Sequence, residues 1–354
     1  MEYSQPNLDN FTLIIPTFQK PHFAKRQLKY WSKTNINLHI VDGSPMPLYN
    51  IEDYLNENIH YHHMKNLSLE KRLGLSTDFI STKYSGLLAD DGFFLPSGIV
   101  HSINDIKVNN LGVSKGQCYN FYYKSEQVIG YRSYKNLKSF NTTASTSYGR
   151  MIEHLCPYRM ISLWSIMESE LMKTIFRAIG RTGKLGSAAC TEIQISLISS
   201  YLGHISGNDS LLLLKSYENS NIWWSEGKYA FHTWYEMEKF IDEKDHFLNI
   251  TANEISISTG LEKDNILSDI EKALDNYSAF SKRFTAKKIK QRVLGYVKKF
   301  SPNYHSLLYD IMYNNSPDEL KKNICKEISK SSFNEYEVDQ IVEIINQFHI
   351  VKNN

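Results

Sequence analysis

The sequence predicts an α/β fold with a mostly parallel sheet flanked by helices, followed by an all-helical C-terminal domain. In the first half, short continuous apolar runs alternate with helical patterns, and polar residues follow each apolar run. Beyond residue 225, almost every segment has helical periodicity. Continuous apolar runs are typical of strands buried on both faces of a parallel sheet. We therefore expect two domains, residues 1–225 and 226–354.

The first predicted strand is the apolar run Thr12–Ile15. Pro16 follows it, and because proline has no N–H to donate, we expect the strand to end there. Residues Ala24–Trp31 then show helical spacing, with Leu28 and Trp31 on the inner face. A strand and a helix thus follow one another at the start of the chain.

Two further strands are predicted before the acidic pair Asp90–Asp91. The apolar run Leu38–Val41 ends at Asp42, and the run Tyr84–Ala89 ends at the acidic pair. In an open α/β sheet, ligands bind in the crevice at the carboxyl ends of the strands. We therefore expect Thr17, Asp42 and Asp90–Asp91 to converge on one cleft.

Asp90 and Asp91 are adjacent carboxylates at the tip of a predicted buried strand. Like charges repel, and burying an unpaired carboxylate costs several kcal/mol. Such a pair is placed there mainly when a cation or a polyhydroxyl ligand binds. The alternative is a simple Asp-Asp-Gly turn, since both residue types are common in turns. The polar residues at the other strand ends favour the ligand site.

The remaining strands and the C-terminal helices are predicted from the same patterns. Further strands are expected at Gln117–Tyr123, Gln127–Tyr131 and Leu211–Leu214. Helices are expected where apolar residues recur three and four positions apart. These segments are His232–Ile241, Asn265–Phe280, Ala286–Phe300, Pro317–Ser329 and Glu335–Phe348.

Composition excludes several classes of protein. A hydrophobic content of 42% is that of a globular chain, and a net charge of +2 gives no reason to expect a nucleic-acid partner. The first ten residues contain no apolar core of a signal peptide, and no run reaches the ~18 apolar residues of a membrane span. The four cysteines show no metal-binding spacing. We therefore expect reduced thiols in a cytoplasmic protein.

Three motifs in this order resemble the GT-A fold nucleotide-sugar glycosyltransferases. They are TLIIPTF at Thr12–Phe18, IVDGS at Ile40–Ser44 and LADDGFFLP at Leu88–Pro96. The resemblance is to the family 2 type found in bacterial surface-polysaccharide synthesis, and it covers roughly residues 10–220. It implies a Rossmann-like GT-A domain and an inverting transfer of sugar from a nucleotide-sugar donor to a glycan or lipid-linked acceptor. Many relatives carry a third Asp where this chain has Gly92.

The resemblance also implies roles for residues that would bind the nucleoside. Pro16, Thr17 and Phe18 match the loop that wraps the nucleobase. Asp42 matches the acid that accepts a hydrogen bond from the base, although an Asp-Gly turn is the alternative there. Asp90 matches the residue that faces the ribose.

Asp91 matches the metal ligand of the family, which implies Mn²⁺ or Mg²⁺ as the cofactor. These hard cations often take only one or two protein carboxylates, with phosphate and water as the other ligands. Arg72 lies on a predicted helix ahead of the acidic pair, where relatives often carry an arginine that approaches the nucleotide. A surface charge on that helix is the alternative for Arg72.

An inverting enzyme needs a carboxylate that takes the proton of the acceptor hydroxyl. In the family this base lies at the start of a helix well beyond the acidic motif, and Glu192 fits that position. The positive end of the helix dipole favours the ionised form that a base requires. Glu168 and Glu170 are the reserve candidates, and a Glu that serves only the helix is the alternative.

Residues 282–299 form a basic amphipathic segment. A helix of this kind can lie on an anionic membrane surface, where lipid-linked acceptors reside. The segment is therefore a candidate for peripheral contact with the inner face of the membrane. A solvated helix face is the alternative.

Two other function classes compete with the glycosyltransferase. One is a non-catalytic carbohydrate-binding or assembly subunit that kept the fold and lost the acid at the Gly92 position. The other is a sugar nucleotidyltransferase, a class that usually has a glycine-rich, basic phosphate loop after the first strand. Residues Pro16–Pro21 contain no such loop, which disfavours that class.

Overall fold

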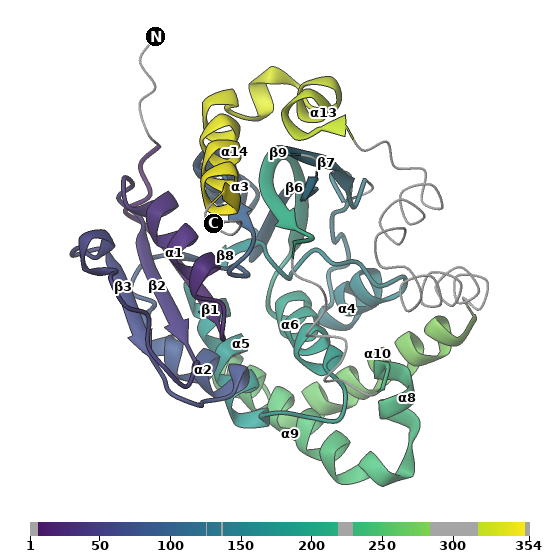
Figure 1. Cartoon of the computed structure of the whole chain (residues 1–354). Coiled ribbons are helices and arrows are strands. Elements are labelled where there is room, and N and C mark those ends of the chain that lie inside the picture. The colour runs from purple at the N-terminus through teal and green to yellow at the C-terminus, as the bar shows by residue number, and fades with distance from the viewer. Residues whose placement is uncertain (1–5, 125, 136, 219–228, 284–317, 351–354) are drawn as a thin grey trace, which may run out of the picture.

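The computed structural model describes residues 6–124, 126–135, 137–218, 229–283 and 318–350. Its centre is a ten-stranded mixed sheet with helices on both faces (Figure 1). The strands are β1 (Phe11–Thr17), β2 (Asn37–Asp42), β3 (Ile59–His63), β4 (Tyr84–Leu87), β5 (Phe93–Phe94), β6 (Val113–Lys124), β7 (Gln127–Ser133), β8 (Ile166–Glu168), β9 (Ile205–Ser216) and β10 (Asp318–Glu319). The helices are α1 (Pro21–Trp31), α2 (Leu69–Leu75), α3 (Pro96–Asn109), α4 (Ser147–Leu155), α5 (Ser169–Thr182), α6 (Ala189–Leu202), α8 (Phe231–Glu236), α9 (Ile241–Thr259), α10 (Lys263–Arg283), α13 (Leu320–Glu327) and α14 (Glu335–Ile350).

The main strand order is β10-β7-β6-β8-β4-β1-β2-β3, and β9 pairs with β5 and β6 off this path. β1 is parallel to both β2 and β4, and β2 is parallel to β3. β8 runs antiparallel to its neighbours β4 and β6. As a result, β6 and its parallel partner β9 point the same way as β1. The predicted fold class, a mostly parallel sheet flanked by helices, is confirmed.

β1 extends through Pro16 to Thr17, so the expectation that Pro16 ends the strand is wrong. The carbonyl of Ile14 accepts a hydrogen bond from the N–H of Leu88 on the β4 side (3.1 Å). Backbone groups two residues apart in a strand point to the same side, so Pro16 also faces β4. The pairing of β1 with β4 ends at Ile14. The missing N–H of Pro16 therefore removes no ladder hydrogen bond.

Two hydrophobic clusters cover the two faces of the sheet. One joins α1 and α3 to α13 and α14, and includes Leu28 and Ile345. The other joins α4, α5 and α6 to α9 and α10, and includes Ile175 and Ile270. The C-terminal helices thus bury apolar side chains against the same sheet as the N-terminal half. The division into two domains at residue 225 stays a prediction.

Over residues 229–283 and 318–350 the C-terminal region is helical, as predicted, with one short strand in addition. The predicted helix at 286–300 lies outside the described residues. The predicted helices at 265–280 and 335–348 lie within α10 and α14, and the segment 232–241 is divided between α8, a 3-10 turn and the start of α9. β10 adds an antiparallel pairing with β7 just before α13. Within the described ranges, no helix is both long and apolar enough to cross a bilayer.

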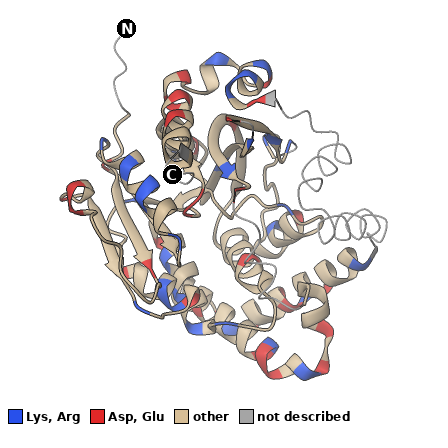
Figure 2. Cartoon of the chain, in the orientation of Figure 1, with Lys and Arg blue, Asp and Glu red and all other residues tan. Residues whose placement is uncertain are grey.

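The basic segment 282–299 lies outside the described residues, apart from its first two positions. Lys282 forms an ion pair of 2.8 Å with Glu236. Over the described part of the chain, basic and acidic side chains are interspersed (Figure 2). Contact of the segment 282–299 with a membrane stays a prediction.

Candidate active site

The carboxyl ends of β1, β2 and β4 lie at one edge of the sheet, as predicted. Thr17 is the last residue of β1 and is paired in register with Asp42, the last residue of β2. The Thr17 hydroxyl donates a 2.7 Å hydrogen bond to Oδ2 of Asp90, which follows β4. Pro16 and Phe18 flank Thr17, and the side chain of Phe18 is 45% exposed. A single ligand at this edge can therefore contact all three strand ends.

Asp42 is buried, and its carboxylate is held by two neighbours. Oδ1 accepts a hydrogen bond from the Ser44 N–H (2.8 Å) and a second from the Ser44 hydroxyl. Oδ2 accepts one from the Tyr61 hydroxyl (2.7 Å). Burial and the hydrogen bond to Asp42 raise the pKa of Tyr61, so this phenol stays a donor. The sequence did not single out Tyr61, because alternating residues of an edge strand look like ordinary surface positions.

Arg72 lies on α2, as predicted, and reaches the strand ends. Its Nη1 donates to the carbonyl oxygens of Thr17 and Val41, each at 2.6 Å. Burial lowers the pKa of Arg72, and the negative charge of Asp42 opposes this shift. Gly43 provides the space, since a Cβ there would lie 2.7 Å from Nε of Arg72. Arg72 therefore braces β1 against β2 beside the predicted nucleotide site, and it is not a surface charge.

The acidic pair lies in a turn whose main chain is held by α1. The Gly92 N–H donates to the Ala89 carbonyl (3.1 Å), which closes the turn. Gln27 Nε2 donates to the carbonyls of Asp90 (3.1 Å) and Gly92 (2.5 Å). Arg26 Nη2 donates to the carbonyl of Asp91 (2.8 Å). Two adjacent side chains of α1 thus fix three consecutive carbonyls of the turn. The motif is therefore a turn, and as a turn it can still present its carboxylates to a ligand.

Gly92 packs against the backbone of β9. A Cβ at this position would lie 3.2 Å from the carbonyl oxygen of Leu214 and 3.4 Å from a methyl carbon of Leu88. The first distance is shorter than an ordinary van der Waals contact. The close approach of β9 gives a physical reason for glycine where many relatives carry a third Asp.

Asp90 is the more buried of the two acids. Burial and the neighbouring Asp91 raise the pKa of Asp90 to about 6, against the opposing hydrogen bond from Thr17. A carboxyl whose pKa is higher in the folded state favours folding when it is protonated. The stability it contributes is therefore present below its unfolded pKa and is lost as the pH rises towards 6.

Asp90→Asn is accordingly expected to stabilise the fold at pH 7, by about 2 kcal/mol, because an amide carries no charge to desolvate. Urea unfolding of the wild type and the variant at pH 7 measures this difference. The same comparison at pH 4 is the control, since Asp90 is then largely protonated and the gap should shrink. A variant less stable than the wild type at pH 7 would show that the ionised carboxylate is favourable here.

Glu192 lies in the first turn of α6, as predicted, and is half-buried. Its Oε1 accepts a hydrogen bond from the Tyr158 hydroxyl. Burial raises the pKa of Glu192, and this effect outweighs the Tyr158 hydrogen bond and the positive charges of Lys215 and Lys115. The direction is opposite to the one expected from the helix dipole. The raised pKa of Glu192 lies closer to neutral pH, and a general base works best when its pKa is near the operating pH.

Lys215 on β9 connects Glu192 electrostatically to the acidic turn. Its Nζ lies 4.6 Å from the centre of the Trp164 ring and 3.3 Å from the Tyr134 hydroxyl. Burial lowers the pKa of Lys215, and the negative charges of Glu192 and Asp91 oppose this shift. One ammonium group therefore interacts with the predicted base and with the predicted metal ligand.

Lys115 holds the loop that carries Trp164. Its Nζ is completely buried and donates to the carbonyls of Met160 (2.9 Å) and Leu163 (2.7 Å). Trp164 has a φ of 53°, a conformation that a bulky residue adopts only when its surroundings impose it. Neither lysine is predicted from the sequence, because a lysine usually marks an exposed position. Their positions are the signal that could have found them: Lys115 lies inside a strand, and Lys215 directly follows the apolar run Leu211–Leu214.

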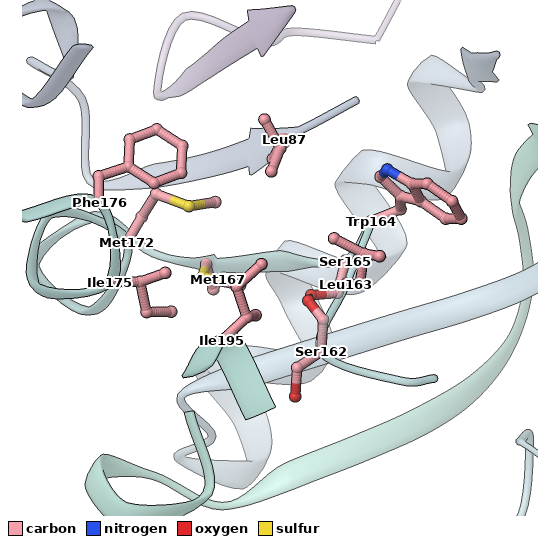
Figure 3. A pocket seen from close by; sticks show the side chains of 10 residues that line it. All are labelled: Leu87, Ser162, Leu163, Trp164, Ser165, Met167, Met172, Ile175, Phe176 and Ile195. Carbon is pink, nitrogen blue, oxygen red and sulfur yellow. The ribbon is translucent and has the colours of Figure 1, made fainter. Parts of the chain in front are cut away.

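A small, mainly apolar pocket lies between the end of β4 and α6 (Figure 3). Leu87, the last residue of β4, and Ile195, one turn beyond Glu192, both line it, and Trp164 lies at one end. The remaining lining residues are Ser162, Leu163, Ser165, Met167, Met172, Ile175 and Phe176. The pocket thus lies between β4, the strand that leads into the acidic turn, and α6, the helix that carries Glu192.

The reserve candidates Glu168 and Glu170 lie at the other edge of the sheet. Glu168 is paired with Tyr84, the first residue of β4, whereas Asp90 follows the last residue of that strand. Glu170 is exposed and forms an ion pair with Lys173 (2.8 Å). Of the three predicted bases, Glu192 shares the electrostatic partner Lys215 with Asp91 of the acidic turn.

Among the described residues, no group of three or more His, Cys, Asp or Glu side chains is arranged to hold a metal ion. Asp90 and Asp91 are the two carboxylates of the acidic turn. Two carboxylates suit Mg²⁺ or Mn²⁺, because these ions accept phosphate and water as further ligands. The fixed carbonyls of the turn would keep such a pair in place when a ligand arrives.

No family profile matches the sequence, and no curated protein matches it. The chain is similar in structure to S. aureus TarS 1–349 in complex with UDP-GlcNAc, with a TM-score of 0.51 and 11% identity. That likeness covers 97% of this chain and 91% of the other. The chain has the GT-A fold. A second structure of TarS 1–349 gives a TM-score of 0.48 and 12% identity over the same shares. At such low sequence identity, the structural likeness shows similarity of fold alone.

Proposed function

We propose that the protein is an inverting, metal-dependent glycosyltransferase that moves a sugar from a nucleotide-sugar donor to a hydroxyl of a glycan or lipid-linked acceptor. The observation that carries this proposal is the convergence of Thr17, Asp42 and Asp90–Asp91 at one edge of the sheet. The GT-A fold supports it, and the TarS structure with UDP-GlcNAc supports a UDP-sugar as the donor.

In this proposal Asp42 binds the nucleobase and Asp90 binds the ribose. A carboxylate has about four acceptor sites, and the bonds from Ser44 and Tyr61 use three of those on Asp42. One site is left for an N–H of the base. Asp90 is oriented by Thr17 and can accept a hydrogen bond from a ribose hydroxyl. We assign the exposed ring of Phe18 to contact with the base.

Asp91 is the residue to which we assign the divalent cation, with Asp90 beside it. When bound, the cation would neutralise charge on the diphosphate leaving group. The chain's own contribution is positional: Gln27 and Arg26 fix the main chain of the turn. The ammonium of Lys215 adds a positive charge near the same place.

Glu192 is the proposed general base. Its carboxylate would accept the proton of the acceptor hydroxyl as the hydroxyl oxygen attacks the anomeric carbon and the bond to the phosphate oxygen breaks. The Tyr158 hydroxyl orients this carboxylate, and burial keeps its affinity for a proton high. Trp164, whose ring lies against Lys215, is the aromatic side chain to which we assign contact with the sugar ring.

A nucleotide panel in a thermal-shift assay tests the donor site. UDP, GDP, TDP and CMP are compared, and we expect UDP to raise the melting temperature, because a ligand at a hundredfold excess over its Kd stabilises by about 2.7 kcal/mol. Asp42→Asn should remove most of this shift. Asp53→Ala is the control, since Asp53 is exposed on a separate 3-10 turn. The absence of a shift with every nucleotide would contradict the proposed donor site.

A further inference from the structure

The guanidinium of Arg26 connects the acidic turn to the C-terminal part of the chain. Nη2 donates to the Asp91 carbonyl, and Nη1 forms a 2.8 Å ion pair with Glu218, just beyond β9. The side chains of Arg26 and Glu218 are 1% and 6% exposed. The second carboxylate oxygen of Glu218 bonds to Nε2 of His349, in the last turn of α14. These three side chains form a continuous chain of contacts from α14 to the acidic turn.

Each member of this chain is held in position by further contacts. The His349 ring stacks on Tyr123 of β6, with ring centres 4.0 Å apart and planes at 6°. The guanidinium of Arg26 lies over the rings of Phe23 and Phe93. Burial alone would raise the pKa of Glu218, but Arg26 and His349 outweigh it and lower that pKa. Glu218 is therefore a buried, ionised carboxylate that contacts both Arg26 and His349.

We propose that His349 and Glu218 are positioning residues for the acidic turn: they fix Arg26, and Arg26 fixes the main chain at Asp91. The inference rests on the proposed function, because the position of the turn matters for a reaction only if the turn belongs to the donor site. Within such a site, a displacement of 1 Å can cost about 10²-fold in rate. The C-terminal helix is then part of the catalytic apparatus without touching substrate.

α14 has other attachments that keep it docked when His349 is changed. Glu337 accepts hydrogen bonds from the N–H (3.0 Å) and hydroxyl (2.7 Å) of Ser97 at the start of α3. Lys29 of α1 donates to Gln347 Oε1 (2.6 Å). The Lys29–Gln347 hydrogen bond also joins α1 to α14, but it involves neither the acidic turn nor Glu218. Gln347→Ala is therefore a matched control for His349→Ala.

The test combines hydrogen–deuterium exchange of peptides covering residues 88–95 with steady-state kinetics on a UDP-sugar, using the full chain. In His349→Ala we expect exchange in 88–95 to be roughly fivefold faster, because the polar contact that orients Glu218, the ion-pair partner of Arg26, is lost. We expect kcat to fall about tenfold with a smaller change in KM. His349→Gln retains an N–H donor and should recover most of both effects. Gln347→Ala should match the wild type.

Glu218→Gln should show the larger effect, because it leaves the buried Arg26 without its anion. If this variant does not fold, the His349 series still decides, because the His349 side chain is 24% exposed. Equal exchange in 88–95 for His349→Ala and Gln347→Ala would overturn the inference. If the wild type neither binds a nucleotide nor turns over any donor, the proposed function fails, while the exchange comparison still decides whether α14 holds the turn.

Discussion

Glu192→Gln is expected to lower the turnover number by about 10²- to 10⁴-fold, the usual contribution of a general base. The amide keeps the size of the side chain and can still accept the Tyr158 hydrogen bond, but it cannot take a proton at neutral pH. The affinity for UDP should barely change, because Glu192 lies on α6 and the nucleotide residues lie at the strand ends. Steady-state kinetics and titration calorimetry with UDP measure the two quantities separately.

Glu170→Gln is the matched control for this substitution. Glu170 is also an acid in the first turn of a helix, but it is exposed at the other edge of the sheet, and we expect wild-type turnover. If the Glu192→Gln enzyme has near-normal turnover, or loses UDP binding instead, Glu192 has a structural role and is not the general base.

The same assignment predicts the pH dependence of kcat/KM. A base must be deprotonated, so the rate rises with pH through the pKa of Glu192, which burial places above its ordinary value. The Tyr158 hydrogen bond opposes that shift. Tyr158→Phe removes this bond, and the rising limb of the profile should move to higher pH. A limb that moves to lower pH, or does not move, would argue against Glu192 as the titrating group.

Asp91→Asn is expected to abolish metal-dependent transfer, with a loss of about 10²-fold or more, because a neutral amide is a poor ligand for a hard cation. Arg26 donates to the main-chain carbonyl of Asp91, which the substitution leaves in place, so the turn should keep its shape. Mn²⁺-dependent rates for the two proteins, together with their melting temperatures, test this expectation.

Treatment of the wild type with EDTA is the complementary experiment. Activity should be lost and should return when Mn²⁺ or Mg²⁺ is added. Wild-type activity that EDTA leaves undiminished would exclude a cation at Asp91. It would then favour a nucleoside-monophosphate sugar as donor, because that leaving group needs less neutralisation.

The donor side of the site could be predicted from local patterns. The apolar runs ending near Ile15, Val41 and Ala89 have the composition of strands buried on both faces, and parallel strands place their carboxyl ends at one edge. The contact of Thr17 with Asp90 follows from that arrangement. The predicted end of β1 at Pro16 is wrong because the sequence does not show that the pairing of β1 with β4 has already ended at Ile14.

The supporting residues could not be predicted, because they act across long stretches of sequence. Arg26 has the spacing of a surface residue on an amphipathic helix, and its partner Glu218 is 192 residues away. Lys115 and Lys215 become buried only when β6 and β9 pair with each other inside the sheet. The direction of the Glu192 pKa shift also depends on tertiary burial, which the helix position alone does not reveal.

Release of UDP from a UDP-sugar by the wild-type protein, measured with Mn²⁺ and without acceptor, tests the central claim most directly. The proposed function predicts slow but clear release above the protein-free rate, because water can replace the acceptor hydroxyl in the site. The release should stop with EDTA and fall sharply in Glu192→Gln. Nucleotide binding without any release of nucleotide from UDP-, GDP-, TDP- or CMP-linked sugars would contradict a glycosyltransferase and favour a non-catalytic binding subunit.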